Sequence, residues 1–249
     1  MEDNLTTRQY WENYYTRSYT KDHIISVCSK YDAFWEILTK NNDRSPKDII
    51  EIGGFPGRYL SYISAKYDLE PTCLDYNKNI EKSKFCFEQM GVKKYHLISA
   101  DFDNFSPNKQ YDIVLSQGFV EHFNNFNSIL DKHVQYLRRG GTMMISVPNK
   151  RNLRYIYGLL VDHANLKKHN IKVIKKNVFE DFAKRNKLDL IKFQYHGGFP
   201  YAVHQKLNPI QRIIYRTTRA FFKKVNPFLE KHPNKYTCSS LICVFKKNW

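Results

Sequence analysis

A carboxylate and three glycines at the end of one predicted strand have the residue types of a small-molecule binding site. Residues 48–54 form a short, mostly apolar run that ends in glycine, which predicts a buried strand. Gly53, Gly54 and Gly57 permit backbone conformations and close approaches that a side chain would block. The helical spacing after Gly57 predicts a helix N-terminus, whose free N–H groups can bind polar groups of a ligand. Glu51 adds a hydrogen-bond acceptor beside them, and an ordinary strand-to-helix turn is the alternative.

Carboxylates also end the next two predicted strands. Asp75 ends the strand within residues 70–77, about 20 residues beyond the glycine turn, where a carboxylate can accept hydrogen bonds from ribose hydroxyls. Capping of the following helix is the alternative for this residue. Asp101 closes the third predicted strand, residues 95–102, and Phe102 follows it. A hydrogen-bond acceptor beside an aromatic ring suits a purine.

Polar and titratable residues cluster at the tip of the fourth predicted strand, residues 111–123. They are Ser116, Gln117, Glu121 and His122. Because the carboxyl ends of parallel strands meet at one edge of an open sheet, we expect these side chains to lie beside the glycine turn. Gln117 is expected to contact a cofactor bound there.

The elements that must position these residues alternate between strands and helices. Strands are predicted within residues 48–54, 70–77, 95–102, 111–123, 142–149, 188–198 and 236–247. Helices are expected between the first six of them, and the helix over 127–139 is expected to end at Gly140-Gly141. This order predicts an α/β fold with a doubly wound, seven-stranded, Rossmann-like sheet.

Two helices are predicted before the first strand, within residues 7–42, and Thr6 or Thr7 can cap the first of them. Aromatic residues on this first helix are expected in the core, with Tyr14 or Tyr15 as part of a lid as the alternative. Residues 1–45 are thus interpreted as an N-terminal helical cap, and residues 46–249 as the main domain.

Charge is distributed unevenly along the 249 residues. Residues 1–148 carry 18 Lys and Arg and 19 Asp and Glu, whereas residues 149–249 carry 22 and 5, a net charge of +17. This segregation favours an anionic partner for the C-terminal part, and a solvated basic face is the alternative. Much of the charge belongs to a basic helical segment within an insertion at residues 205–235, expected to break near Pro227.

Several classes of protein are disfavoured by the sequence. The glycine spacing is not that of a nicotinamide-binding turn, since Ile52 stands where a glycine would be needed. The five cysteines are scattered without metal-ligand spacing and are expected to be reduced thiols. No apolar run has membrane-spanning length, so a cytoplasmic protein is expected, with peripheral contact at the inner membrane surface as a further expectation.

Residues 46–150 resemble the class I S-adenosylmethionine-dependent methyltransferases, particularly the ubiquinone-pathway O-methyltransferases. The resemblance implies S-adenosyl-L-methionine as cofactor and an antiparallel seventh strand. It also implies that the methionine end is held by Glu51 and the glycine turn, the ribose by Asp75 with Tyr76 beside it, and the adenine by Asp101 and Phe102. The pair Glu121-His122 and the sequence LRRGG match further motifs of the family.

Two positions depart from the family pattern. Phe55 stands where family members commonly have glycine, so we expect either a different backbone path there or a ring turned toward the acceptor. Gly118 stands where some quinone O-methyltransferases have a glutamate that helps to bind a divalent metal. We therefore expect no metal.

The resemblance implies a cofactor half, residues 46–150, and an acceptor half, residues 151–249. Methyl transfer from a sulfonium depends mainly on alignment, and His122 is the best-placed base, with Glu121 to orient it or to hold the cofactor's amine. A local hydrogen bond of His122 is the alternative. Acceptor contacts are expected from Tyr14, Tyr15, His196, Arg212 and Arg216, with His204 as a weaker candidate.

The expected acceptor is a small or lipid-linked molecule that carries phosphate, such as a nucleotide-activated or glycan intermediate. An RNA methyltransferase is the first alternative, supported by the positive charge but lacking a recognisable RNA-binding module. A non-catalytic cofactor-binding protein with a basic docking face is the second.

Overall fold

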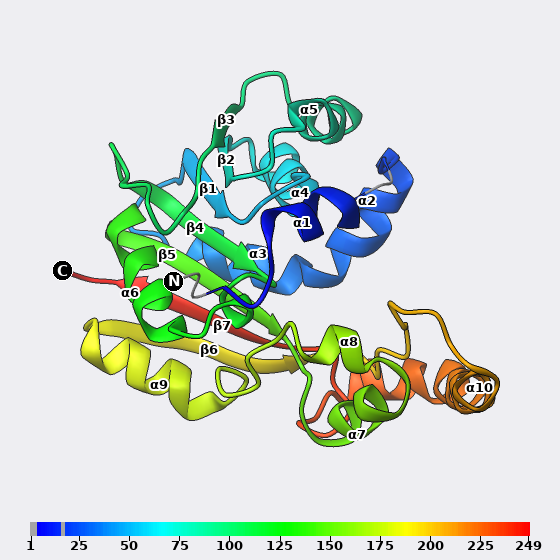
Figure 1. Ribbon diagram of the computed structural model, residues 1–249. Coiled ribbons are helices and arrows are strands. Elements are labelled where there is room, and N and C mark those ends of the chain that lie inside the picture. Colours follow the sequence, from blue (N-terminus) through cyan, green and yellow to red (C-terminus); the bar gives the residue numbers. More distant parts are fainter. Residues whose placement is uncertain (1–3, 16–17) are drawn as a thin grey trace.

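A seven-stranded sheet forms the centre of the computed structural model, which describes residues 4–15 and 18–249 (Figure 1). Its strands are β1 Asp48–Ile52, β2 Glu70–Asp75, β3 His96–Ser99, β4 Tyr111–Gln117, β5 Leu137–Pro148, β6 Leu188–His196 and β7 Ser240–Lys247. The order across the sheet is β3-β2-β1-β4-β5-β7-β6. Strands β1 to β5 pair in parallel, and β7 is antiparallel to both β5 and β6. The predicted doubly wound sheet with an antiparallel last strand is therefore confirmed.

Helices cover both faces of this sheet (Figure 1). They are α1 Arg8–Tyr14, α2 Lys21–Cys28, α3 Asp32–Lys40, α4 Arg58–Tyr67, α5 Ile80–Gln89, α6 Phe126–Tyr136, α7 Asn152–Val161, α8 His163–Leu166, α9 Lys176–Arg185 and α10 Pro209–Lys231, with short 3-10 helices η1 Ser29–Tyr31 and η2 Val120–His122. Side chains of α2, α3, α4 and α5 share one hydrophobic core, and those of α6 and α9 share the other.

Strand β1 shows why the central strands read as continuous apolar runs. Ile49 belongs to the core on one face of the sheet and Ile50 to the core on the other, because successive side chains of a strand point to opposite faces. Both faces are covered by helices, so both positions must be apolar. Glu51 is the exception within this buried strand, at 2% exposed.

Several elements differ from the sequence-based predictions. No helix lies between β3 and β4 in the described residues, and the second predicted N-terminal helix is divided into α2, η1 and α3, so both expectations are wrong. Helix α6 ends at Tyr136, and Gly140-Gly141 lies inside β5, so the predicted helix end at these glycines is wrong. Helix α10 is continuous through Pro227, so the predicted break is wrong as well. Strand β4 ends at Gln117, and η2 carries the Glu-His pair beyond it.

The segments outside the sheet divide into two groups. Residues of α2 and α3, such as Ile24 and Trp35, pack into the same core as β1, whereas α1 has no buried residue. The division of the chain at residue 45 stays a prediction. Helices α7, α8 and α10 extend to one side of the sheet, around a separate small core of Tyr157, Val161, Phe199 and Phe222 (Figure 1).

Two further observations concern cysteines and membranes. All five cysteines are buried and free, with Cys73 in β2 and Cys243 in β7 as predicted. Within the part of the chain that the structure describes, no helix is both long and apolar enough to cross a bilayer.

Candidate functional site

A cavity of about 340 Å³ opens at the carboxyl ends of β1, β4 and β5, where the strand order reverses. This is the position at which open α/β sheets bind ligands, and the volume is that of a small-molecule site. A second, smaller cavity adjoins it and contains Asp75 and Tyr76. The two cavities share the lining residues Trp11, Tyr15, Gly53, Gly118 and His122.

The turn from β1 into α4 needs glycine for its path. Gly53 has φ 68° and Gly57 has φ 89°, which are left-handed conformations that favour glycine. A Cβ at Gly53 would lie 2.4 Å from Cδ2 of Phe119, and a Cβ at Gly54 would lie 2.9 Å from the side chain of Glu51. Gly53 and Gly54 line the larger cavity, whereas Gly57 begins α4 behind them.

Buried polar atoms without partners border the larger cavity. Within residues 4–15 and 18–249, no hydrogen-bond partner is present for Oε2 of Glu51, Nε2 of Gln117 or Nε of Arg58. Burial raises the pKa of Glu51 to about 8, so this carboxyl group is largely protonated at pH 7. Unsatisfied buried groups are costly, and a polar ligand that pairs with them would recover that cost.

Arg58 was not identified from the sequence, although its position in the first turn after the last glycine of the loop was a usable signal. Its guanidinium lies over the ring of Tyr19 at 4.8 Å and over that of Tyr59 at 5.1 Å. The two rings orient the cation at the cavity wall.

Asp75 ends β2 at the smaller cavity, with Tyr76 next to it. Its Oδ1 accepts a hydrogen bond from the Asn77 N–H at 2.8 Å, and its Oδ2 accepts one from the Phe55 N–H at 3.3 Å. Burial raises the pKa of this carboxyl to about 6. The carboxylate is thus held in place by the backbone and is ionised at neutral pH.

His122 lines the larger cavity with its Nε2 beside Glu121. Its Nδ1 lies 2.7 Å from the carbonyl oxygen of Lys168, so Nδ1 carries the hydrogen and Nε2 has a free lone pair. Nε2 lies 3.5 Å from Oε1 of Glu121. Burial lowers the pKa of His122 to about 4 and raises that of Glu121 to about 8, so both side chains are largely neutral at pH 7.

His169 joins this pair from the segment after α8. Its Nδ1–H donates to the Asn165 carbonyl at 2.7 Å, which leaves Nε2 free, and its ring centroid lies 4.8 Å from that of His122. The ligand atoms of Glu121, His122 and His169 all lie within 4.8 Å of one another, a set that could hold a divalent cation. The prediction that no metal is used therefore stays untested. No local pattern in the sequence marked His169.

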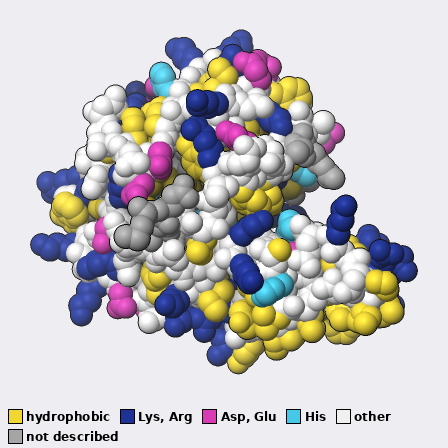
Figure 2. All heavy atoms as spheres, in the orientation of Figure 1, with side chains coloured by type: hydrophobic (Ala, Val, Ile, Leu, Met, Phe, Trp, Pro, Cys, Tyr) yellow, Lys and Arg dark blue, Asp and Glu magenta, His cyan; other side chains and the backbone are white. Residues whose placement is uncertain are grey.

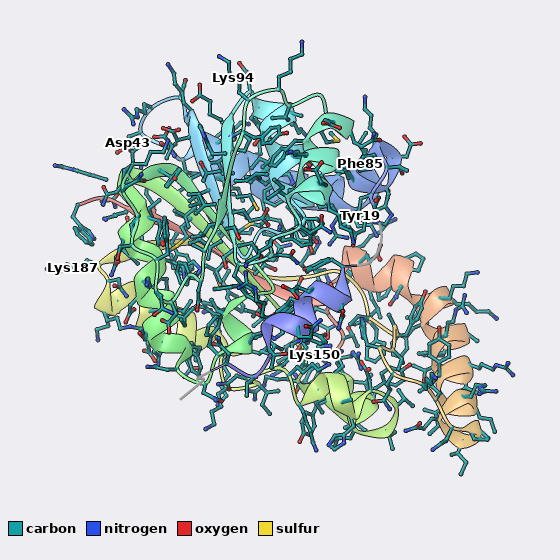
Figure 3. All side chains as sticks on the ribbon, turned by 45° about the horizontal axis from the view of Figure 1, so that its top comes forward. Tyr19, Asp43, Phe85, Lys94, Lys150 and Lys187 are labelled. Carbon is teal, nitrogen blue, oxygen red and sulfur yellow. The ribbon has the colours of Figure 1, made fainter. Side chains whose placement is uncertain are left out.

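Lys150 supplies a buried cation at the end of β5, where Figure 3 shows it between α1 and the α7 region. Its side chain is 8% exposed. Burial, followed by the charge of Arg154, lowers its pKa to about 8, so the ammonium is still largely protonated at pH 7. Lys150 was missed from the sequence, although a lysine directly after a predicted central strand was a usable signal.

Helix α1 lies over the opening of the cavities. Tyr14 and Tyr15 both line the larger cavity, with Tyr14 6.3 Å from the ring of His204 and Tyr15 5.3 Å from that of Phe55. The indole of Trp11 meets His122 edge-on at 4.9 Å. The alternative expectation of a lid thus agrees with the position of this helix, and the ring of Phe55 is part of the same wall.

The structure does not bring the predicted adenine contacts to either cavity. Asp101 is exposed and accepts hydrogen bonds from the Asp103 N–H and the Asn104 side chain. Phe102 is 3% exposed and packs in the core against Tyr136, so the expectation that its ring covers a ligand is wrong. The sequence could not distinguish a core ring from a cavity ring at this strand end.

Three predicted acceptor contacts also lie elsewhere. His196 packs against the rings of Tyr31 and Phe34 and lines a different cavity. Arg212 and Arg216 are exposed on α10, outside both cavities described above. A charge stripe in sequence does not reveal whether its helix faces a cavity or solvent.

Comparisons with known proteins identify the family of the chain. A sequence profile of the methyltransferase domain family matches residues 22–192. The chain is similar to the ubiquinone biosynthesis O-methyltransferase of Rickettsia canadensis, with 28% identity over 127 residues that cover 51% of this chain and 53% of that protein. The chain thus spans about half the length of the relatives it matches.

Solved structures share the fold. A SAM-dependent methyltransferase from Archaeoglobus fulgidus superposes with a TM-score of 0.60 at 15% identity, covering 97% of this chain and all of that chain. Coclaurine N-methyltransferase bound to N-methylheliamine and SAH superposes with a TM-score of 0.55 at 12% identity, covering 87% of this chain and 70% of that chain. Similarities at this level of identity show the fold alone.

Proposed function

The chain belongs to the methyltransferase domain family, and we propose that it is an S-adenosylmethionine-dependent enzyme that methylates a small anionic molecule beside His122 and Lys150. One observation carries the proposal. A cavity at the switch point of the sheet contains buried groups that have no hydrogen-bond partner among the described residues, a histidine nitrogen that bears no hydrogen, and a buried cation.

The cofactor fits the buried groups by charge. S-adenosylmethionine has an ammonium and a carboxylate at its amino-acid end, which suit the unpartnered carboxyl of Glu51 and the cation of Arg58. Its ribose hydroxyls suit the ordered carboxylate of Asp75 in the adjoining cavity. Gly53 and Gly54 allow the chain to turn closely past Phe119 and Glu51, so that the backbone of this turn lines the cavity.

When bound, S-adenosylmethionine supplies a methyl carbon already activated by the positively charged sulfur. The chain's own task is then chiefly to align the acceptor and exclude water. His122 can take the proton of an acceptor hydroxyl at Nε2, because the carbonyl of Lys168 fixes the hydrogen at Nδ1. Trp11 and Tyr15 of the α1 region cover this position.

The anionic character of the acceptor is argued from Lys150. Within residues 4–15 and 18–249, no carboxylate lies within ion-pair distance of its ammonium, although the side chain is 8% exposed. The charge of Asp162 acts on this ammonium only from beyond ion-pair distance, and a negative group on the acceptor would provide a direct countercharge. A phosphate group, as first expected, belongs to this class, as do an ionised phenol and a carboxylate.

The test uses S-adenosylmethionine labelled in the methyl group. The protein is incubated with a small-molecule fraction, a lipid fraction and an RNA fraction of a cell extract, with the Asp75→Ala variant as control. Label that enters a small or lipid-linked anionic molecule supports the proposal. Label in RNA that ribonuclease removes would contradict it, and binding of S-adenosylhomocysteine without any transfer would favour a non-catalytic binding protein.

A further inference from the structure

The part of the molecule formed by α7 and α10 has a large exposed apolar surface. Eight large hydrophobic side chains on these two helices are between 41% and 71% exposed. They are Leu153, Ile156, Leu159, Leu160, Ile210, Ile213, Phe221 and Phe228, which we call the apolar patch. Figure 2 shows hydrophobic side chains gathered along this margin of the molecule. Apolar surface of this extent usually marks an interaction site in a water-soluble fold.

The two helices are joined firmly enough to present one surface. Gln211 of α10 donates a hydrogen bond to the Leu160 carbonyl of α7 at 2.9 Å. Phe222, the only buried residue among the 23 of α10, stacks on Phe199 with ring centroids 3.9 Å apart. The apolar side chains Ile210, Ile213, Phe221 and Phe228 of the same helix remain between 60% and 71% exposed.

Positive charge lies beside the apolar side chains on α10. Helix α10 carries six lysines and arginines and a single acidic residue, Glu230. Arg216 follows Ile213 by three residues, and Lys224 follows Phe221 by three, spacings that make them neighbours on the helix surface. The other arginines of α10, Arg212 and Arg219, are separated from the apolar side chains by at most the width of the helix, about 10 Å. This is close to the screening length at physiological salt, so their charge can still act at the same surface. An apolar face with a basic border matches the surface of an anionic bilayer.

We propose that α7 and α10 dock the protein onto an anionic phospholipid bilayer, with the apolar patch in contact with the interface. A second copy of the chain is a poorer occupant, because two patches face to face would bring their basic borders together. The helices lie on the membrane surface and do not span it, in agreement with the absence of a spanning helix from the described residues.

The docked helices are connected directly to the candidate active site. Arg154 of α7 pairs with Asp162 at 2.9 Å, and Asp162 in turn accepts a hydrogen bond from the His204 N–H at 2.9 Å. His204 and Asn165 line the larger cavity. A bilayer under α7 and α10 would therefore place the cavity close to lipid-linked acceptors, an extension that rests on the proposed function. The docking itself does not require methyl transfer.

The experiment measures sedimentation of the full chain with vesicles, without cofactor or acceptor. Vesicles of phosphatidylcholine alone are compared with vesicles of equal parts phosphatidylcholine and phosphatidylglycerol. One variant combines Ile156→Ser, Ile213→Ser and Phe221→Ser, and a second combines Arg216→Gln and Lys224→Gln. Matched controls are Ile25→Ser, at an exposed site on α2, and Lys93→Gln with Lys94→Gln, far from α10 in Figure 3.

We expect the wild-type chain to bind the anionic vesicles. Each patch variant should bind them with an affinity lower by a factor of about ten or more. The controls should bind like wild type, and all variants should keep the wild-type circular dichroism and affinity for S-adenosylhomocysteine. Absence of wild-type binding to anionic vesicles would overturn the proposal. An equal loss of vesicle binding in the control variants would also overturn it. So would a concentration-dependent dimer of the wild-type chain that the apolar variant abolishes, if neither of these two proteins binds vesicles.

Discussion

Glu51 gives the most demanding test of the cofactor site. Its carboxyl is 2% exposed, and burial raises its pKa to about 8 in the free protein. If it pairs with the ammonium of the cofactor, it must be ionised in the complex, since an adjacent positive charge lowers the pKa of a carboxyl group. Binding below pH 8 should therefore release a proton, and affinity should increase as the pH rises toward 8.

The size of the effect follows from the pKa. A group of pKa about 8 is about 1% ionised at pH 6 and about 24% ionised at pH 7.5. If the complex requires the ionised form, the affinity for S-adenosylhomocysteine should increase about 24-fold between these pH values, or about 1.9 kcal/mol. Isothermal titration calorimetry in buffers of different ionisation enthalpy should also detect release of nearly one proton at pH 7.

The matched variants are Glu51→Gln and Glu121→Gln, because both carboxyls line the cavity and both have a pKa of about 8. Glu51→Gln should bind S-adenosylhomocysteine weakly and with little pH dependence, whereas Glu121→Gln should retain the wild-type slope. A wild-type affinity that does not change with pH, or a slope that survives in Glu51→Gln, would refute the assignment of the ammonium to Glu51.

The same pKa makes a prediction for stability. Because the folded-state pKa of Glu51 lies above its ordinary value of 4.5, the folded protein holds the proton more tightly than the unfolded chain does. The ligand-free protein should therefore lose stability as the pH rises from about 4.5 to about 8, and little more above that range. Thermal unfolding should show a shallower loss for Glu51→Gln.

The other predictions concern single side chains of the site. Asp75→Ala should weaken S-adenosylhomocysteine binding at least about tenfold, because charge-assisted hydrogen bonds are lost, with circular dichroism unchanged; unaltered affinity would exclude the ribose role. His122→Asn should lower kcat by about 100-fold or more and spare S-adenosylhomocysteine affinity, whereas a parallel fall in both would indicate a structural role. Lys150→Gln should raise the acceptor's KM and leave S-adenosylhomocysteine binding intact, and an unchanged KM would contradict pairing with an anion. Turnover should survive chelation; loss that a divalent metal restores would instead assign Glu121, His122 and His169 to a metal.

The residues proposed to hold the cofactor were predictable as a group because they lie at the ends of successive parallel strands. Glu51, the glycines and Asp75 each follow a short apolar run, and the alternation of such runs with helices specifies a sheet in which these ends meet. Tyr14 and Tyr15 were recognised as candidates by type, but nothing local distinguished a lid from core packing.

The boundaries that failed did so because tertiary contacts outweighed local signals. From Thr142 onward, β5 pairs with β4 on one side and with β7 on the other. This pairing places Gly140-Gly141, a glycine pair typical of a helix end, inside a strand. Phe222 and Asn226, which bonds to the backbone of Phe199, anchor α10 before Pro227, and Leu229 packs against the same small core after it, so the helix continues through the proline.

The sequence by itself determined the fold class and the gathering of Glu51, the glycines and Asp75 at one edge of the sheet, since both depend on periodicity and on residues at fixed offsets from strands. Only the tertiary structure decided the acceptor side. His169 and Lys150 come from segments whose positions relative to His122 are set by packing, and their burial determines their charge states. The same packing turned Phe102 into the core and placed Arg212 on the outer surface, because the direction of a side chain depends on which neighbours cover its element.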